Sequence, residues 1–133
     1  MFLLDTNVVS ETRKSRPHGG VMTWLASVDE SRLFLSAVTI GEIQRGIELT
    51  RQQDSQKALE LTAWLDAIIE SQAVLPMGAG TFRLVATLMH RKSDTLYEDA
   101  MIAATALERE LTVVTRNVQD FREFGVPLFN PFS

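Results

Sequence analysis

The sequence predicts an α/β fold in which helices flank a parallel sheet of about four to five short strands. Short apolar runs, beginning with Met1-Phe2-Leu3-Leu4, fit strands that are covered on both faces. These runs alternate with longer segments whose apolar residues recur at helical spacing, and parallel strands need such crossover connections. With 133 residues, the chain is expected to form a single domain over residues 1–133.

Two short helices and a strand are expected after the first strand. The spacing of apolar residues predicts helices over 8–13 and 21–28. Pro17 and the pair Gly19-Gly20 separate them, because proline and paired glycines interrupt a helix. Leu33 to Leu35 is a second brief apolar run and is predicted to be a strand.

A helical hairpin is expected in the middle of the chain. Thr39-x-x-Glu42 has the spacing of a capping box, which predicts a helix that begins there and continues through Leu49. Asp54 or Ser55 can cap the second helix of the hairpin. The residues predicted to face inward on this second helix are Leu61, Trp64, Leu65, Ile68 and Ile69.

The second half of the chain is predicted to alternate strands and helices again. The strands are expected over 73–75, 111–114 and 126–129, and the helices over 81–92 and 100–107, with a short helix around Phe121 and Phe124. Pro127 restricts the last strand to an edge of the sheet. Thr95-x-x-Glu98 is a second capping-box match, in front of a helix so apolar that it should be buried nearly all round. In the helix over 81–92, the residues expected to face inward are Phe82, Val85, Leu88 and Met89.

The composition excludes a disordered chain and a protein that coats nucleic acid through bulk charge. Apolar residues make up 45%, charged residues 23%, and the formal net charge is -4. A nuclease stays compatible with this charge, because magnesium sites are themselves acidic. A local basic patch such as Arg13, Lys14 and Arg16 can attract phosphates, although a solvated loop explains the same residues.

Several signals favour a cytoplasmic protein without a membrane partner. No stretch approaches the roughly 20 apolar residues that cross a bilayer, and the N-terminus lacks the basic segment of a signal peptide. The chain has no cysteine, so it has neither disulfides nor thiolate metal ligands. Any metal must therefore be held by oxygen or histidine.

Asp5 follows the first predicted strand directly. Ligand sites in open parallel sheets lie beyond the carboxyl ends of the strands, so Asp5 is a candidate metal or catalytic group. Asp-Thr-Asn is also good turn and capping chemistry, which gives Asp5 a structural alternative. Taken together with the other acids, Asp5 is predicted to be a ligand, and capping is assigned to Thr6 or Asn7.

Asp99 is the acid that local structure explains least well. Glu42 and Glu98 can each close a capping box, whereas Asp99 lies one residue further along. Its helical neighbours include Ile102 and Ala103, on the face most suited to burial. An unpaired buried carboxylate costs several kcal/mol, so Asp99 needs a metal, a hydrogen-bond network or an arginine partner.

A third polar group follows the strand over 111–114 and consists of Thr115, Asn117 and Asp120. These residues fit either a ligand site at a strand end or an Asx turn into the next helix. Oxygen side chains thus recur at places that an α/β fold brings together. They suit Mg²⁺ or Mn²⁺, which prefer carboxylates and water.

Other catalytic classes find no support. His18 and His90 are isolated and predicted to be surface residues, and there is neither a cysteine nor a G-x-S-x-G turn. Gly78 and Gly80 match neither a P-loop nor a dinucleotide-binding fingerprint.

Four ordered blocks resemble the signature of PIN-domain ribonucleases. They are Asp5-Thr6-Asn7, Ser36-x-x-Thr39-x-x-Glu42, Asp99 to Ala106, and Val114-Thr115-Arg116-Asn117-x-x-Asp120-Phe121. The resemblance extends over nearly the whole chain and is closest to the VapC toxins of bacterial type II toxin-antitoxin modules. It implies a three-layer α/β/α domain, usually a homodimer, that cleaves RNA with Mg²⁺ or Mn²⁺ and is inhibited by a cognate VapB-type antitoxin.

The resemblance also implies site residues. The first three acids of the family map to Asp5, Glu42 and Asp99, while the usual fourth acid is replaced by Asn117, and Asp120 lies three residues on as a possible substitute. Asp5 and Asp99 would bind the metal, and Glu42 would complete its shell or position the attacking water. Thr6, Thr115 and Asn117 would orient these groups or the substrate, and Arg13 and Arg116 would contact the RNA backbone.

The leading hypothesis is therefore a Mg²⁺- or Mn²⁺-dependent endoribonuclease that acts as the toxin of a toxin-antitoxin pair. The incomplete fourth acid keeps a second hypothesis open, in which the chain is a PIN-like binding module that acts mainly through protein partners.

Overall fold

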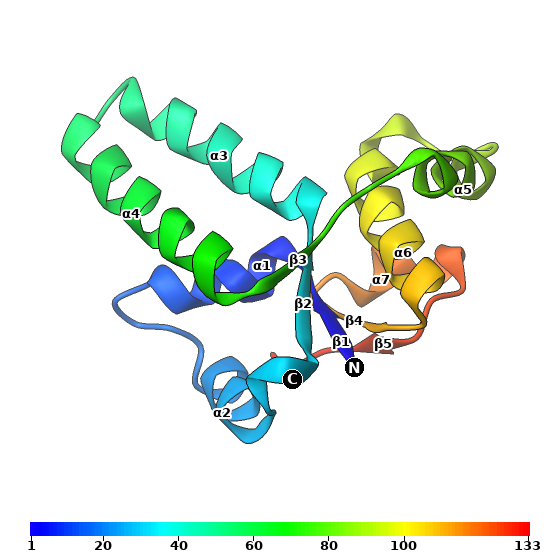
Figure 1. Ribbon diagram of the computed structural model, residues 1–133, viewed down its shortest axis with the longest axis horizontal. Coiled ribbons are helices and arrows are strands. Elements are labelled where there is room, and N and C mark those ends of the chain that lie inside the picture. Colours follow the sequence, from blue (N-terminus) through cyan, green and yellow to red (C-terminus); the bar gives the residue numbers. More distant parts are fainter.

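The computed structural model describes all 133 residues and shows a five-stranded parallel sheet between two layers of helices (Figure 1). The strands are β1 (Phe2–Leu4), β2 (Leu33–Ser36), β3 (Ala73–Leu75), β4 (Thr112–Val114) and β5 (Leu128–Phe129). They are ordered β3-β2-β1-β4-β5, and every neighbouring pair is parallel. The predicted α/β class is confirmed, and the strand after Pro127 lies at an edge as expected.

Helices cover both faces of the sheet. On one side lie α1 (Thr6–Val9), α2 (Gly19–Ser27), α3 (Ala37–Arg51) and α4 (Ser55–Ser71), and on the other lie α5 (Ala79–Met89), α6 (Tyr97–Arg109) and α7 (Val118–Phe121) (Figure 1). Short 3₁₀ turns occupy Ser10–Arg13, Glu30–Arg32, Asp94–Leu96 and Arg122–Phe124. The α3–α4 pair is the predicted helical hairpin. No helix is both long enough and apolar enough to pass through a lipid bilayer.

The alternation of the central strands divides the hydrophobic core into two parts. Leu3 and Val113 point into the cluster beneath α5, α6 and α7, whereas Leu4 and Val114 join the cluster beneath α1 to α4. Because β1 and β4 are buried on both faces, every residue in them is apolar except Thr112. This double burial fixes the register of β1, and with it the position of Asp5.

Both predicted capping boxes are wrong. The side chain of Ser36, buried at the end of β2, accepts a hydrogen bond from Val38 N at 3.3 Å and caps α3, so Thr39 lies buried in the first turn. In the second case, Ser93 caps the 3₁₀ turn over Asp94–Leu96, and α6 starts afterwards without a side-chain cap. Thr39 and Thr95 had the right spacing, but an earlier serine supplies the cap each time. Neither Glu42 nor Glu98 therefore takes part in a helix cap.

Two helices start earlier than their sequence suggested. Asp5 caps α1, which therefore begins at Thr6, and His18 caps α2, which includes the glycine pair expected to interrupt it. His18 Nδ1 accepts a hydrogen bond from Val21 N at 3.3 Å, and the imidazole packs on Phe132 with ring centroids 5.1 Å apart. His18 is thus half-buried and structural, not a free surface residue. His90 is exposed as predicted.

Two residues predicted to face inward are exposed. Ile69 on α4 is 45% exposed and Phe82 on α5 is 46% exposed, so these two predictions are wrong. Leu65 and Val85 are buried, and the other inward predictions on these helices are partly buried against the core: Leu61, Trp64, Ile68, Leu88 and Met89.

Candidate active site

The carboxyl ends of the central strands meet at a topological switch point. From β1 the chain builds outward through β2 and β3, and it then returns to the other side of β1 for β4 and β5. Open parallel sheets place their ligand sites where the strand order reverses in this way. Asp5 directly follows β1 and Thr115 directly follows β4, so both lie at this point.

Asp5 is buried, with 4% of its surface exposed, and both of its carboxylate oxygens accept hydrogen bonds. Oδ1 accepts from Thr6 N at 2.8 Å, and Oδ2 accepts from Thr115 Oγ1 at 2.7 Å and from Asn7 Nδ2 at 3.1 Å. The assignment of the cap to Thr6 or Asn7 is therefore wrong, since Asp5 combines the cap with its place at the site. Burial raises the pKa of Asp5 in spite of these donors.

Glu42 approaches the same edge of the sheet from α3. Its Oε1 accepts a hydrogen bond from Thr6 Oγ1 at 2.9 Å, and the same hydroxyl lies 3.3 Å from Thr39 Oγ1. Burial, followed by the neighbouring Glu98 carboxyl, raises the pKa of Glu42 to about 8. One oxygen of Glu42 is thus fixed by a residue next to Asp5.

Asp99 reaches the site from the first turn of α6. Three fully buried alanines, Ala100, Ala103 and Ala104, allow this helix to lie close to the sheet. Asp99 forms no ion pair and no side-chain hydrogen bond, so the arginine partner considered as its structural explanation does not exist. Burial and the charges of Asp5, Asp120 and Glu98 raise its pKa to about 6. We call Asp5, Glu42 and Asp99 the acid cluster.

Glu11 is a buried acid outside the acid cluster, and its contacts in the protein account for its charge. It is 4% exposed, pairs with Lys14, and accepts a hydrogen bond from His18 N at 2.8 Å. These contacts hold the pKa of Glu11 below its usual value. The members of the acid cluster lack a lysine or arginine partner, and their pKa values move in the opposite direction.

The two candidates for a fourth acidic position differ in their surroundings. Asp120 is exposed, but its charge is close enough to raise the pKa values of both Asp5 and Asp99. Asn117 forms no side-chain hydrogen bond, and its backbone N–H donates to Thr115 Oγ1 at 2.9 Å. Thr115 therefore links the start of α7 to Asp5. Asp120 therefore acts on Asp5 and Asp99 through its charge, whereas Asn117 makes no side-chain hydrogen bond to either.

The two arginines predicted to contact RNA lie in different settings. Arg13 is exposed at the end of the 3₁₀ turn after α1, forms no ion pair, and lines a pocket together with Glu42. The Arg116 guanidinium lies over the Phe132 ring, 3.9 Å from its centroid. Arg13 is thus available to a ligand, whereas Arg116 is partly engaged by the C-terminal tail.

Two residues of the site were not predicted from the sequence. Asn7 donates to Asp5 through Nδ2 and accepts from Arg116 N at 3.3 Å through Oδ1, so it joins the ends of β1 and β4. Its position two residues after Asp5, in good turn chemistry, gave no means of separating this role from a turn. Glu98 raises the pKa values of Glu42 and Asp99. The sequence did not predict this role, because the spacing from Thr95 indicated that Glu98 closes a capping box.

The donor set fits a hydrated Mg²⁺ or Mn²⁺ ion. No three acidic or histidine side chains lie close enough together to form a complete set of direct ligands for one ion. Mg²⁺ commonly takes only one or two carboxylates directly and keeps several waters. Carboxylates and hydroxyls, without histidine or cysteine, are therefore compatible with a site in which some acids bind the ion through water.

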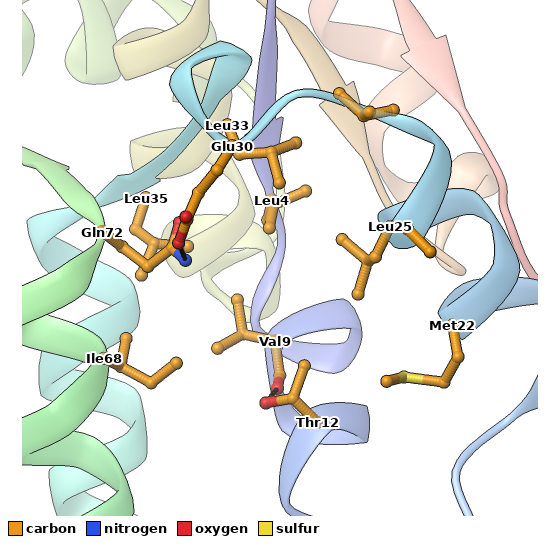
Figure 2. A pocket seen from close by; sticks show the side chains of 12 residues that line it. Leu4, Val9, Thr12, Met22, Leu25, Glu30, Leu33, Leu35, Ile68 and Gln72 are labelled. Atoms are coloured by element: carbon orange, nitrogen blue, oxygen red, sulfur yellow. Dashed lines mark hydrogen bonds between the residues drawn. The ribbon is translucent and has the colours of Figure 1, made fainter.

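A separate cavity lies away from the acid cluster. It has a volume of about 410 Å³ between α2, α4 and the sheet, and Leu4, Val9, Leu25 and Ile68 are among its mainly apolar lining (Figure 2). At one margin, Gln72 Nε2 donates to Glu30 Oε1 at 2.9 Å. No member of the acid cluster lines this cavity, so its size does not make it a candidate for phosphodiester chemistry.

Comparison with known proteins supports the resemblance noted from the sequence. The PIN domain profile matches residues 2–126. Toxin FitB from Neisseria gonorrhoeae is 32% identical over 99% of this chain and 99% of its own, and the VapC ribonuclease Y4jK from Sinorhizobium fredii is 32% identical over 100% and 99%. The crystal structure of FitAcB from Neisseria gonorrhoeae contains a chain with a TM-score of 0.88 and 33% identity, with 99% of each chain covered. The profile match and these full-length relatives show that the chain belongs to the PIN-domain family.

Proposed function

We propose that this protein is a Mg²⁺- or Mn²⁺-dependent endoribonuclease that acts as the toxin of a toxin-antitoxin pair. The observation that carries the proposal is the convergence of Asp5, Glu42 and Asp99, three carboxyls with raised pKa values and no basic partner, at the switch point of the sheet. Names of full-length relatives include a VapC ribonuclease and a toxin.

Each member of the acid cluster has a distinct part in the proposed reaction. Asp5 and Asp99 would hold the ion, and Thr115 and Asn7 fix the Asp5 carboxylate by donating to Oδ2. When bound, the ion would polarise the scissile phosphate and lower the pKa of water. Thr6 fixes one oxygen of Glu42, and the Glu42 carboxyl would orient the attacking water.

The metal requirement and the acids can be tested together. Purified protein incubated with total RNA and Mn²⁺ should produce discrete cleavage products whose 5′ ends can be mapped, and EDTA should abolish them. Asp5→Asn and Asp99→Asn should each reduce cleavage by at least about a hundredfold, the scale expected when an essential charged group is lost. Asp66→Asn on the exposed face of α4 is the matched control. Cleavage by either site variant at the wild-type rate would refute the assignment.

The expected partner is a cognate VapB-type antitoxin. FitAB and FitAcB, which contain similar chains, are solved as assemblies, the former bound to a DNA fragment. Co-expression with the antitoxin should suppress RNA cleavage by this chain. We also expect a homodimer, which light scattering after size-exclusion chromatography would show as twice the chain mass of 14.9 kDa.

A binding module without nuclease activity is the second candidate. It is favoured by Asn117, which brings no charge where the family commonly has an acid, and by the absence of a complete set of three direct ligands. Calorimetric titration with Mn²⁺ separates the two functions. Binding that Asp99→Asn weakens supports the nuclease, whereas no binding at millimolar Mn²⁺ supports the module.

A further inference from the structure

Three pockets adjoin the acidic groups of the site, and their charges differ. One is lined by Leu96, Gln119, Asp120, Arg122 and Glu123, and another by Glu42, Arg45, Gly46, Leu49 and Glu98. Each of these two contains two carboxylates and a single guanidinium, so neither favours a phosphate chain. The third pocket contains Glu42 as its one carboxylate and carries Arg13.

This third pocket, the Trp64 pocket, has a volume of about 260 Å³. It is lined by Thr6, Ser10, Arg13, Glu42, Ile43, Gly46, Ile47, Thr50, Leu61 and Trp64. Thr6 and Glu42 connect it to the acid cluster, and Trp64 is its one aromatic residue. Its volume falls just below the range of about 300–1,000 Å³ typical of sites for whole small ligands. A single planar group such as a nucleobase matches this space better than a complete nucleotide.

The indole of Trp64 is held in place from outside the pocket. Trp64 Nε1 donates to Thr12 Oγ1 at 3.1 Å, and Thr12 Oγ1 in turn donates to Val9 O at 2.7 Å. A ring fixed in this way loses little freedom when a base stacks on it. Ser10 and Arg13 in the same pocket have no side-chain partner in the protein and remain available to a ligand.

Arg13 joins the Trp64 pocket to a strongly basic depression. This basic depression is lined by Arg13, Lys14, Ser15, Arg16 and Lys57, and it contains no carboxylate. Arg13 and Arg16 form no ion pair, whereas Lys14 pairs with Glu11 and Lys57 is 3.8 Å from Glu60. In a chain with a net charge of -4, such a local concentration of cations provides the attraction for phosphates that the whole molecule lacks.

We propose that the Trp64 pocket receives one nucleobase adjacent to the cleaved phosphate, stacked on the indole, and that the following phosphates lie on the basic depression. This inference rests on the proposed ribonuclease function and adds the path of the RNA. The strand leaves the acid cluster between the 3₁₀ turn after α1 and the α3–α4 hairpin. Stacking on an aromatic ring tolerates any base, so this pocket positions the strand and does not by itself read its sequence.

Fluorescence tests the pocket without requiring cleavage. The chain has two tryptophans, so Trp24→Phe leaves Trp64 as the sole reporter, and Asp99→Asn prevents the expected hydrolysis. A short single-stranded RNA of mixed sequence should quench this reporter. Trp64→Leu in the otherwise unchanged protein should weaken binding about tenfold by fluorescence anisotropy, whereas Trp64→Phe should keep most of the affinity. Trp24→Phe alone, at the tryptophan outside the pocket, is the matched control and should leave the affinity unchanged.

Salt dependence tests the basic depression. If Arg16 and Lys57 each contact a phosphate, Arg16→Gln and Lys57→Gln should each lower the slope of log affinity against log salt by about 0.7. Arg83→Gln and Arg109→Gln, at exposed arginines on α5 and α6 beyond the opposite face of the sheet, should leave the slope unchanged.

The outcomes separate this inference from the proposed function. Quenching together with weaker binding by Trp64→Leu supports the nucleobase pocket, whether or not the wild type cleaves RNA. RNA cleavage by the wild type with no quenching and no effect of Trp64→Leu overturns the pocket but leaves the nuclease intact. A protein that neither binds nor cleaves RNA overturns both.

Discussion

At the scale of single residues, the site depends on hydroxyl groups as much as on acids. Thr115 is completely buried, donates to Asp5 Oδ2 and accepts from Asn117 N. Valine has nearly the same shape, but its side chain can neither donate nor accept a hydrogen bond. Thr115 therefore acts on the site through Asp5, as a positioning residue.

Thr115→Val should weaken Mn²⁺ binding by about 10- to 100-fold, the usual cost of losing an outer hydrogen bond to a metal ligand. It should also lower the free energy of unfolding by about 1.5–3 kcal/mol, because a hydrogen bond to a buried charged group is lost. Calorimetric titration and urea denaturation would measure the two effects. Thr112→Val, on a half-exposed residue of β4, the strand that Thr115 follows, is the control. Equal Mn²⁺ affinities for wild type and Thr115→Val would contradict the role of Thr115.

The pKa of Glu42 predicts how stability depends on pH. The group titrates near 4.5 in the unfolded chain and at about 8 in the folded protein. Between these values the folded state holds a proton that the unfolded state has released, so stability falls as pH rises through this window. In metal-free protein, the free energy of unfolding should decrease between pH 6.5 and 8. The decrease should be smaller in Glu42→Gln, and equal slopes for both proteins would contradict the assigned pKa.

Single residues also show what the sequence could and could not predict. Asp99 was identifiable because its helical neighbours are apolar, and the structure confirms that it has no basic partner. The contact of Thr6 with Glu42 spans 36 positions, and no local pattern encodes such a contact. The involvement of Asn7 was hidden for a different reason, since the same residue type suits both a turn and a hydrogen bond to a carboxylate.

At the scale of elements, α6 determines how closely Asp99 approaches the sheet. Ala100, Ala103, Ala104 and Ala106 are all completely buried in it. Larger side chains at these positions would move the helix away from β1 and β4. The small residues are therefore a condition for the geometry of the acid cluster as well as for packing.

Ala104→Leu should destabilise the protein by about 1–3 kcal/mol through overpacking. It should also reduce RNA cleavage at temperatures where the variant is still folded, because the displaced helix carries Asp99. Ala86→Leu on the exposed face of α5 is the matched control and should change neither property. Urea denaturation and a cleavage assay on folded protein would measure the two effects. An Ala104→Leu variant that behaves like the control would contradict the role of the small residues in placing Asp99.

The elements themselves were largely predictable because strands buried on both faces leave uninterrupted apolar runs, as in β1 and β4. The helix starts were less predictable. Ser36 and Ser93 compete with Thr39 and Thr95 for the same helix ends, and the sequence alone does not show which residue adopts the extended backbone that a cap requires.

At the scale of the whole molecule, the acid cluster opposes folding in the absence of a cation. Burial and mutual repulsion raise the pKa values of its members, so their ionised forms are destabilised in the folded protein. Without metal, Asp99→Asn should therefore be more stable than the wild type at pH 8.

Adding Mn²⁺ should reverse this order. At a hundredfold excess over its Kd, the ion stabilises the wild type by about 2.7 kcal/mol, and Asp99→Asn should gain much less. Thermal denaturation with EDTA and with Mn²⁺ tests both statements, and Asp66→Asn should follow the wild type. A wild type that is as stable with EDTA as with Mn²⁺ would argue against metal binding at this site.

The central position of β1 also affects when the protein becomes competent during its synthesis. Asp5 is made 110 positions before Thr115, which holds its carboxylate, and β4 must be paired before the two can meet. A nascent chain on the ribosome therefore carries Asp5 and Glu42 without the strand that completes their surroundings. The translation machinery, itself built from RNA, is not exposed to an assembled acid cluster until β4 and Thr115 have been synthesised.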